Sequence, residues 1–192
     1  FMLTEPIQVT LQVTSILENL GIPYFIGGSM ATAIHGVARS TMDVDLVIDL
    51  RPDQVSSLIK ALQEDFYADE EMIRSSLQHK LSFNLIHHET MFKIDMLPTK
   101  NRAFDHSQFA RREKVILLDA DKLGAYFATP EDNILAKLQW YRAGGETSDR
   151  QWNDILNVLK VRGNSLDIAY MKKWAVDLSV GDLLENAIAS VK

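Results

Sequence analysis

The sequence predicts an α+β fold in which a mixed β-sheet is flanked by helices, with a bundle of helices at the C-terminal end. Short runs rich in β-branched and aromatic residues alternate with helical patterns through the first 128 residues, and after that the pattern is only helical. Hydrophobic residues make up 46% and charged residues 24% of the 192 residues, as in an ordinary folded protein. We therefore predict two domains, 1–128 and 129–192.

The chain opens with a helical pattern and a short strand. Apolar residues recur near helical spacing up to Leu20, where a Gly and a Pro end the pattern, so we expect a helix over about 5–20. Tyr24-Phe25-Ile26 predicts a buried strand that ends in Gly27-Gly28. Ser29 is expected to cap a second helix over residues 30–35, which Gly36 ends.

The middle of the chain predicts the rest of the sheet. Val44 to Leu50 is rich in β-branched residues, and Arg51-Pro52-Asp53 ends that strand and starts a helix up to about Gln63. Residues 81–86 and 91–97 predict a β-hairpin. The polar stretch after Pro98 is expected to be mostly irregular, and two more strands follow at 115–118 and 123–127.

A strong helix start marks the beginning of the C-terminal part. Thr129 suits the N-cap, Pro130 the first helical position, and Glu131 and Asp132 the first turn. We expect helices at about 130–143, 149–162 (capped by Ser148), 166–178 and 181–191.

Composition excludes several classes of protein. With 26 acidic and 20 basic residues the formal charge is −6, so no overall field attracts nucleic acid, and the absence of cysteine excludes disulfides and thiolate metal sites. No apolar run approaches the ~18 residues of a membrane span. We therefore expect a soluble, cytoplasmic protein with no membrane partner; its oligomeric state stays open.

Two aspartates one residue apart are the first candidates for chemistry. Side chains alternate along a strand, so Asp43 and Asp45 point the same way about 7 Å apart, and their repulsion calls for a cation. Asp95, among apolar neighbours on a later strand, offers a third carboxylate. Three carboxylates from two strands suit Mg²⁺ with phosphate oxygens in its shell. The alternatives are a solvated strand end and, for Asp95, an arginine partner.

The order of these features resembles the nucleotidyltransferase superfamily, which has the DNA-polymerase-beta-like fold. A strand, Gly27-Gly28-Ser29, a helix, Asp43-Val44-Asp45 and a later strand with Asp95 follow each other as in that family. The resemblance implies that the glycine turn and Ser29 bind the phosphates of an NTP and that Asp43 and Asp45 hold two Mg²⁺ ions. It further implies that Asp95 binds the metal nearest the acceptor hydroxyl and helps to deprotonate it, before pyrophosphate leaves.

Two basic residues lie close to the acids in the sequence. Arg39 stands just ahead of Asp43, where it would contact phosphate or a carboxylate, or be a surface charge. Lys93 shares a strand face with Asp95, where it would contact phosphate, neutralise the acids, or be a simple surface lysine.

A second resemblance lies in the helical part. Thr129-Pro130-Glu131-Asp132 with Lys137, followed by Arg150 and Asp154, resembles the segment after the catalytic domain in the abortive-infection (AbiEii) and type IV toxin–antitoxin nucleotidyltransferases. That resemblance places Lys137 towards the nucleotide phosphates and Asp154 beside it. The chain departs from that group in its short length and in Trp152-Asn153 before Asp154. The alternatives are that Lys137 is a surface lysine of its helix and that Asp154 is a salt-bridge partner or an acid in the second turn of its helix.

The leading hypothesis is therefore a Mg²⁺-dependent enzyme that transfers NMP from an NTP to an acceptor hydroxyl on a small molecule, a tRNA or a protein. The first alternative is a catalytically silent module that binds nucleotide. The second is a toxin with an antitoxin partner.

Overall fold

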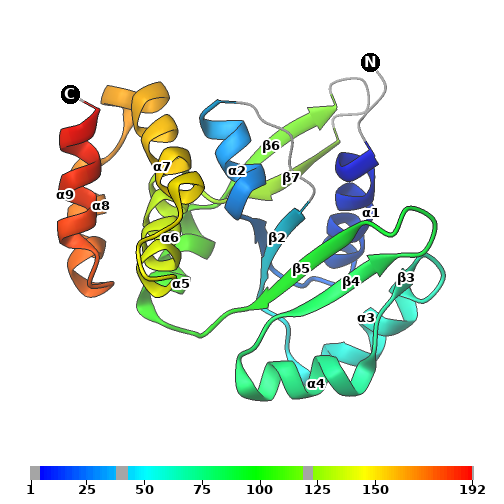
Figure 1. Ribbon diagram of the computed structural model, residues 1–192. Coiled ribbons are helices and arrows are strands. Elements are labelled where there is room, and N and C mark those ends of the chain that lie inside the picture. The colour runs from blue at the N-terminus through cyan, green and yellow to red at the C-terminus, as the bar shows by residue number, and fades with distance from the viewer. Residues whose placement is uncertain (1–4, 38–42, 119–122, 192) are drawn as a thin grey trace. The chain divides into compact units, whose positions relative to one another are not determined.

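The structure is a computed structural model that describes residues 5–37, 43–118 and 123–191 (Figure 1). The chain forms two compact units. The first contains residues 1–27 and 41–127, and the second contains residues 28–40 and 128–192. The helix that follows the glycine turn therefore groups with the C-terminal helices, far away in the sequence. The predicted division into domains 1–128 and 129–192 stays a prediction.

Seven strands within the described residues form one mixed sheet in the first unit, which confirms the predicted fold class. Their order is β3-β4-β5-β2-β1-β7-β6, with β2 and β5 parallel, β1 and β7 parallel, and the other neighbours antiparallel. The strands are β1 (Tyr24–Ile26), β2 (Asp43–Ile48), β3 (Phe66–Tyr67), β4 (Phe83–His87), β5 (Lys93–Pro98), β6 (Glu113–Leu118) and β7 (Leu123–Phe127).

One face of this sheet is apolar and covered by helices. Val44, Leu46 and Ile48 of β2 are fully buried, and the hydroxyl of Tyr24 on β1 donates to Glu18 of α1. Helices α1 (Glu5–Asn19), α3 (Val55–Leu62, after a 3₁₀ turn at Pro52–Gln54) and α4 (Glu70–His79) pack along this side (Figure 1). The removal of these apolar side chains from water is the main contribution to the stability of the unit.

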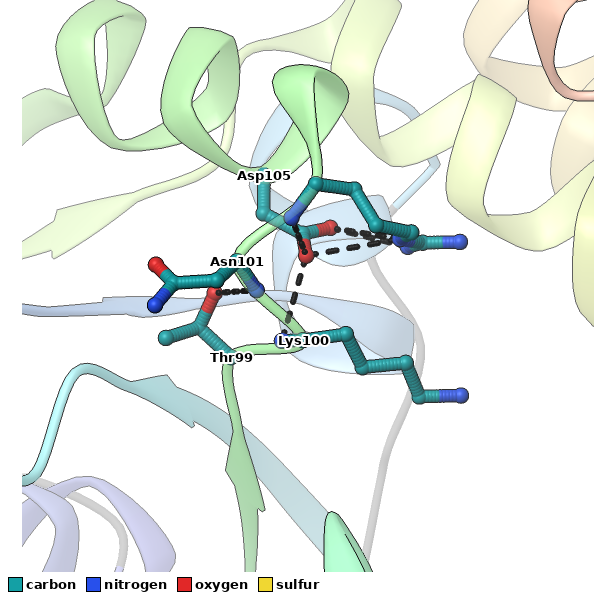
Figure 2. A network of polar contacts seen from close by, with 5 residues as sticks. Thr99, Lys100, Asn101 and Asp105 are labelled. Carbon is teal, nitrogen blue, oxygen red and sulfur yellow. Dashed lines mark hydrogen bonds and ion pairs between the residues drawn. The ribbon is translucent and has the colours of Figure 1, made fainter.

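The structure contains elements that the sequence analysis did not predict: β3 and α4 in the first unit, and a helix on the other face of the sheet. The stretch after Pro98, expected to be irregular, contains helix α5 (Ala103–Arg111), whose Phe109 ring packs against Phe25 of β1 with centroids 5.0 Å apart. The cause is Asp105, which accepts hydrogen bonds from the backbone N–H groups of Lys100 and Arg102 and from the Arg102 guanidinium (Figure 2). An aspartate at the third helical position thus caps a helix that has no Ser or Thr cap.

The second unit contains only helices in its described residues. They are α2 (Gly28–His35), α6 (Pro130–Ala143), α7 (Asp149–Arg162), α8 (Ile168–Asp177) and α9 (Gly181–Ser190). Two of the predicted caps are confirmed, since Thr129 accepts from the N–H of Asp132 and Ser148 from that of Gln151. The predicted cap at Ser29 is wrong: helix α2 begins at Gly28, two residues earlier than predicted, so Ser29 lies in its first turn.

Within the described part of the chain, no helix combines the length and the apolar character that crossing a membrane requires.

Candidate active site

Three polar side chains from three neighbouring strands lie in one row on the face of the sheet opposite to α1, α3 and α4. Asp45 of β2 is the register partner of Asp95 of β5, which is in turn the partner of Asn84 of β4. Residues directly opposite each other point to the same face with Cβ atoms about 5 Å apart. Asp43 lies one pleat along β2, opposite Lys93. The register therefore brings the predicted acids 43, 45 and 95 onto one face.

These acids are more exposed to solvent than the apolar residues that alternate with them along the same strands. Asp43 is exposed, Asp45 and Asp95 are half-buried, and the alternating residues Val44, Leu46 and Ile94 are fully buried. Strands β2 and β5 are thus fixed from below by apolar packing while their carboxylates face outwards. A rigid strand pair is a suitable support for ligands that have to keep their positions.

Lys93 places a positive charge next to Asp95 on this face. Its Nζ lies 3.1 Å from Oδ1 of Asp95, and the side chains of Lys93 and Asp95 are 43% and 24% exposed. The hydrogen bond to Asp95, together with the charges of Asp95, Asp43 and Asp45, raises the pKa of the Lys93 ammonium above its ordinary value. Lys93 therefore stays protonated and offsets part of the repulsion among the acids.

The donor set suits a hard divalent cation. Carboxylate and amide oxygens are the ligands that Mg²⁺ prefers, and Asp45, Asp95 and Asn84 present such oxygens side by side. Among the described residues, however, no group of three or more His, Asp or Glu side chains is drawn together into a metal cluster. The assignment of Asp43, Asp45 and Asp95 as metal ligands thus stays a prediction, and Lys93 is the group that now contacts Asp95.

The glycine turn begins at the end of β1. The N–H of Gly27 donates to the carbonyl of Asp45 at 2.9 Å, so this group ties the turn to the strand that carries the acids. Gly28 has φ of 55°, a left-handed conformation that favours glycine because it lacks Cβ. The predicted phosphate contacts of the turn therefore depend on Gly28 and Ser29, which start helix α2.

Helix α2 is held in the second unit by buried polar contacts. The hydroxyl of Thr32 donates to the carbonyl of Gly28 at 3.0 Å and accepts from Nδ2 of Asn133 on α6, also at 3.0 Å. Both side chains are about 1% exposed. At the other end of the helix, His35 Nε2 contacts the carbonyl of Ala128, and Arg162 of α7 donates to the carbonyl of His35. These contacts fix the position of Gly28 within its unit.

Lys137 and Asp154 form a buried ion pair between α6 and α7. Lys137 Nζ lies 2.9 Å from Asp154 Oδ2, and the two side chains are only 10% and 5% exposed. The expectation that Asp154 lies beside Lys137 is confirmed by this contact. The expected contact of Lys137 with nucleotide phosphate stays a prediction.

Some residues were missed or are not described. Asn84, Thr32 and Asn133 were not predicted as part of a site, because the hairpin register and the pairing of α2 with α6 are long-range features. Arg39, predicted to bind nucleotide, lies outside the residues that the structure describes.

Comparisons with known proteins agree with this fold. The sequence profile of the family described as "Nucleotidyltransferase of unknown function (DUF6036)" matches residues 7–186. No curated protein shows significant sequence similarity to the chain.

Among solved structures, the fold is similar to an antigenic nucleotidyltransferase-like protein from Paracoccidioides brasiliensis, at 18% identity and a TM-score of 0.54, covering 93% of this chain and 92% of that one. It is also similar to ANT(2")-Ia in complex with adenylyl-2"-tobramycin, at 10% identity and a TM-score of 0.55, covering 92% and 98%. The lincosamide adenylyltransferase LnuA, lincomycin-bound, gives 12% identity and a TM-score of 0.52, covering 83% and 98%.

At these identities the structural comparisons establish the fold alone, and the abortive-infection subgroup is not confirmed. The family match spans nearly the whole chain. The chain therefore belongs to the DUF6036 nucleotidyltransferase family and is, by that membership, a transferase enzyme.

Proposed function

We propose that this protein is a Mg²⁺-dependent nucleotidyltransferase that moves NMP from an NTP to an acceptor hydroxyl with release of pyrophosphate. The observation that carries the proposal is the register of β2 and β5, which puts Asp45 beside Asp95 with Asp43 one pleat away. In a member of a nucleotidyltransferase family, this acidic row is the natural candidate for the catalytic centre.

Asp43, Asp45 and Asp95 would hold the divalent ions. When bound, Mg²⁺ neutralises phosphate charge and lowers the pKa of a coordinated hydroxyl. Asp95 is suited to the acceptor side, because its half-buried carboxylate can orient a hydroxyl and accept its proton. Asn84, opposite Asp95, can donate a hydrogen bond to an acceptor oxygen.

Basic side chains and backbone N–H groups are proposed to bind the phosphates of the donor NTP. We propose that the N–H groups of Gly28 and Ser29, at the start of α2, bind phosphate with help from the helix dipole. Lys93 and Arg39 would add positive charge. Lys137 would donate to phosphate while it keeps Asp154, since an ammonium has three N–H donors and the contact with Asp154 uses one.

The acceptor is proposed to be a small molecule, a tRNA or a protein. Small molecules come first, because solved structures of similar fold are named for tobramycin and lincomycin complexes. The net charge of −6 disfavours long nucleic acid. The location is proposed to be the cytoplasm.

The test is incubation with each [α-³²P]NTP and Mg²⁺ against tobramycin, lincomycin, tRNA and cell protein. We expect label transfer to one acceptor class, lost by at least about 100-fold in Asp43→Ala, since a metal ligand supplies several kcal/mol to the transition state. Asp53→Ala is the matched control, because Asp53 is an exposed partner of Arg51 on another element.

Two outcomes would overturn the proposal. Equal transfer by Asp43→Ala and wild type would remove the acids from the chemistry. Binding of NTP without transfer to any acceptor would favour the silent nucleotide-binding module. An antitoxin partner would be indicated only if growth arrest on expression depends on the same aspartate and is relieved by the product of a neighbouring gene.

A further inference from the structure

Lys93 stands opposite the acids of the candidate site, and its contact with Asp95 has a consequence for metal binding. The ammonium lies 3.1 Å from Asp95 Oδ1, and Lys93 is the register partner of Asp43 on the neighbouring strand. Asp95 is thus already paired with a cation that belongs to the chain.

A metal ion at Asp95 would compete with this ammonium. A carboxylate oxygen that ligates a divalent ion loses electron density for a hydrogen bond, and two cations a few ångström apart repel each other. The Lys93 side chain is 43% exposed on a four-carbon stem, so the ammonium can leave Asp95 without disturbing the core. Nothing comparable holds for Lys137, whose ammonium is buried against Asp154.

Phosphate supplies the reason for Lys93 to leave. An NTP carries several negative charges. When the Lys93 ammonium turns from Asp95 to a phosphate oxygen, it keeps an anionic partner, and the Asp95 carboxylate becomes free to ligate metal. Asp95 then has a cation beside it in both states, the Lys93 ammonium before binding and the metal after it.

Resting on the proposed function, we propose that Lys93 is an internal counter-cation that holds Asp95 until nucleotide binds, so that the divalent cation and the NTP bind cooperatively. Metal alone then binds weakly because it has to displace the ammonium. With nucleotide present, Lys93 moves to phosphate and metal binds more tightly. By linkage the metal strengthens nucleotide binding by the same factor.

The experiment measures Mn²⁺ affinity, without turnover, by electron paramagnetic resonance of free Mn²⁺, with and without an α,β-methylene NTP. Lys93→Met keeps the apolar stem and removes the charge. We expect Mn²⁺ alone to bind about two- to fivefold more tightly to Lys93→Met than to wild type, the range for a partly exposed ion pair. The enhancement of Mn²⁺ affinity by nucleotide should be smaller in Lys93→Met than in wild type by the same two- to fivefold, while the part that comes from phosphate oxygens ligating the metal stays.

Two controls keep the test sharp. Lys93→Arg retains the charge and should restore weak Mn²⁺ binding. Lys100→Met removes a lysine that follows the same strand and whose backbone N–H donates to Asp105 (Figure 2), and it should behave as wild type.

Equal or weaker Mn²⁺ affinity in Lys93→Met would overturn this inference while leaving the proposed function intact. Failure of every variant, including wild type, to bind Mn²⁺ would overturn the proposed function as well.

Discussion

The buried ion pair between α6 and α7 gives a prediction of measurable size. Lys137 and Asp154 are 2.9 Å apart with side chains 10% and 5% exposed, so Lys137→Met leaves a carboxylate in a region that water hardly reaches. Removal of one partner of a buried pair costs about 3–5 kcal/mol. Since Asp154 has a further interaction besides Lys137, we expect the lower end, about 3 kcal/mol.

Urea unfolding measures this loss directly. All three tryptophans, at 140, 152 and 174, belong to the second unit, and Trp152 of α7 packs on Tyr141 of α6 with centroids 5.2 Å apart. Their fluorescence therefore reports on the elements that the pair connects. With an m-value of about 2 kcal/mol per molar urea, the midpoint should fall by about 1.5 M.

A double variant and a surface control separate the pair from general disruption. Lys137→Met with Asp154→Leu removes both charges and should recover to within about 1 kcal/mol of wild type, because an apolar pair can replace a buried ionic one. Glu146→Gln, which removes an exposed partner of Arg142, should leave the midpoint unchanged. A change below about 0.5 kcal/mol for Lys137→Met would refute the reasoning from burial.

Three further predictions follow from other contacts. Asp105→Asn should lower stability by about 1–3 kcal/mol at pH 7. Burial alone would raise the pKa of the Asp105 carboxyl, but the hydrogen bonds from Arg102 and Lys100 outweigh it and hold the pKa below its ordinary value. The difference from wild type is therefore full above about pH 4 and should vanish as pH falls through that lowered pKa, as thermal melts across pH would show. Thr32→Val leaves Asn133 without its acceptor and Gly28 without its hydroxyl donor, so nucleotide affinity by calorimetry and stability should both fall, by about 1–3 kcal/mol in stability; Thr32→Ser should match wild type. Gly28→Ala forces a side chain into φ of 55°, and we expect a loss of about 1 kcal/mol in urea unfolding.

The sequence predicted most elements because their signals are local. Helix α6 has a Thr cap, a Pro at the first position and acids in the first turn, and the structure has it over the predicted residues 130–143. The strands with Asp43, Asp45 and Asp95 were predicted from β-branched residues and parity. Both kinds of signal lie within a few residues of the element itself.

Other features depend on contacts that no local pattern encodes. Helix α5 was missed because its start depends on Asp105 reaching back to the N–H groups of Lys100 and Arg102, with no Ser or Thr to mark the cap. His87 lies just beyond the predicted strand 81–86, but it is the last residue of β4, buried against Phe66 with ring centroids 5.1 Å apart.

Local sequence patterns likewise predicted only part of the candidate site. Parity along each strand put Asp43 with Asp45 and Lys93 with Asp95. Only the pairing of β2 with β5 could show that Asp45 lies beside Asp95 and Lys93 opposite Asp43. The burial of Lys137 with Asp154, and the link from Asn133 through Thr32 to Gly28, likewise needed the packing of helices distant in sequence.

Anomalous diffraction from crystals grown with Mn²⁺ and an α,β-methylene NTP tests the central claim most directly. We predict Mn²⁺ peaks within ligand distance of the carboxylates of Asp43, Asp45 and Asp95, with the Lys93 ammonium withdrawn from Asp95. Peaks bound elsewhere, or an Asp95 side chain turned away from Asp45 when metal and nucleotide are present, would contradict the account.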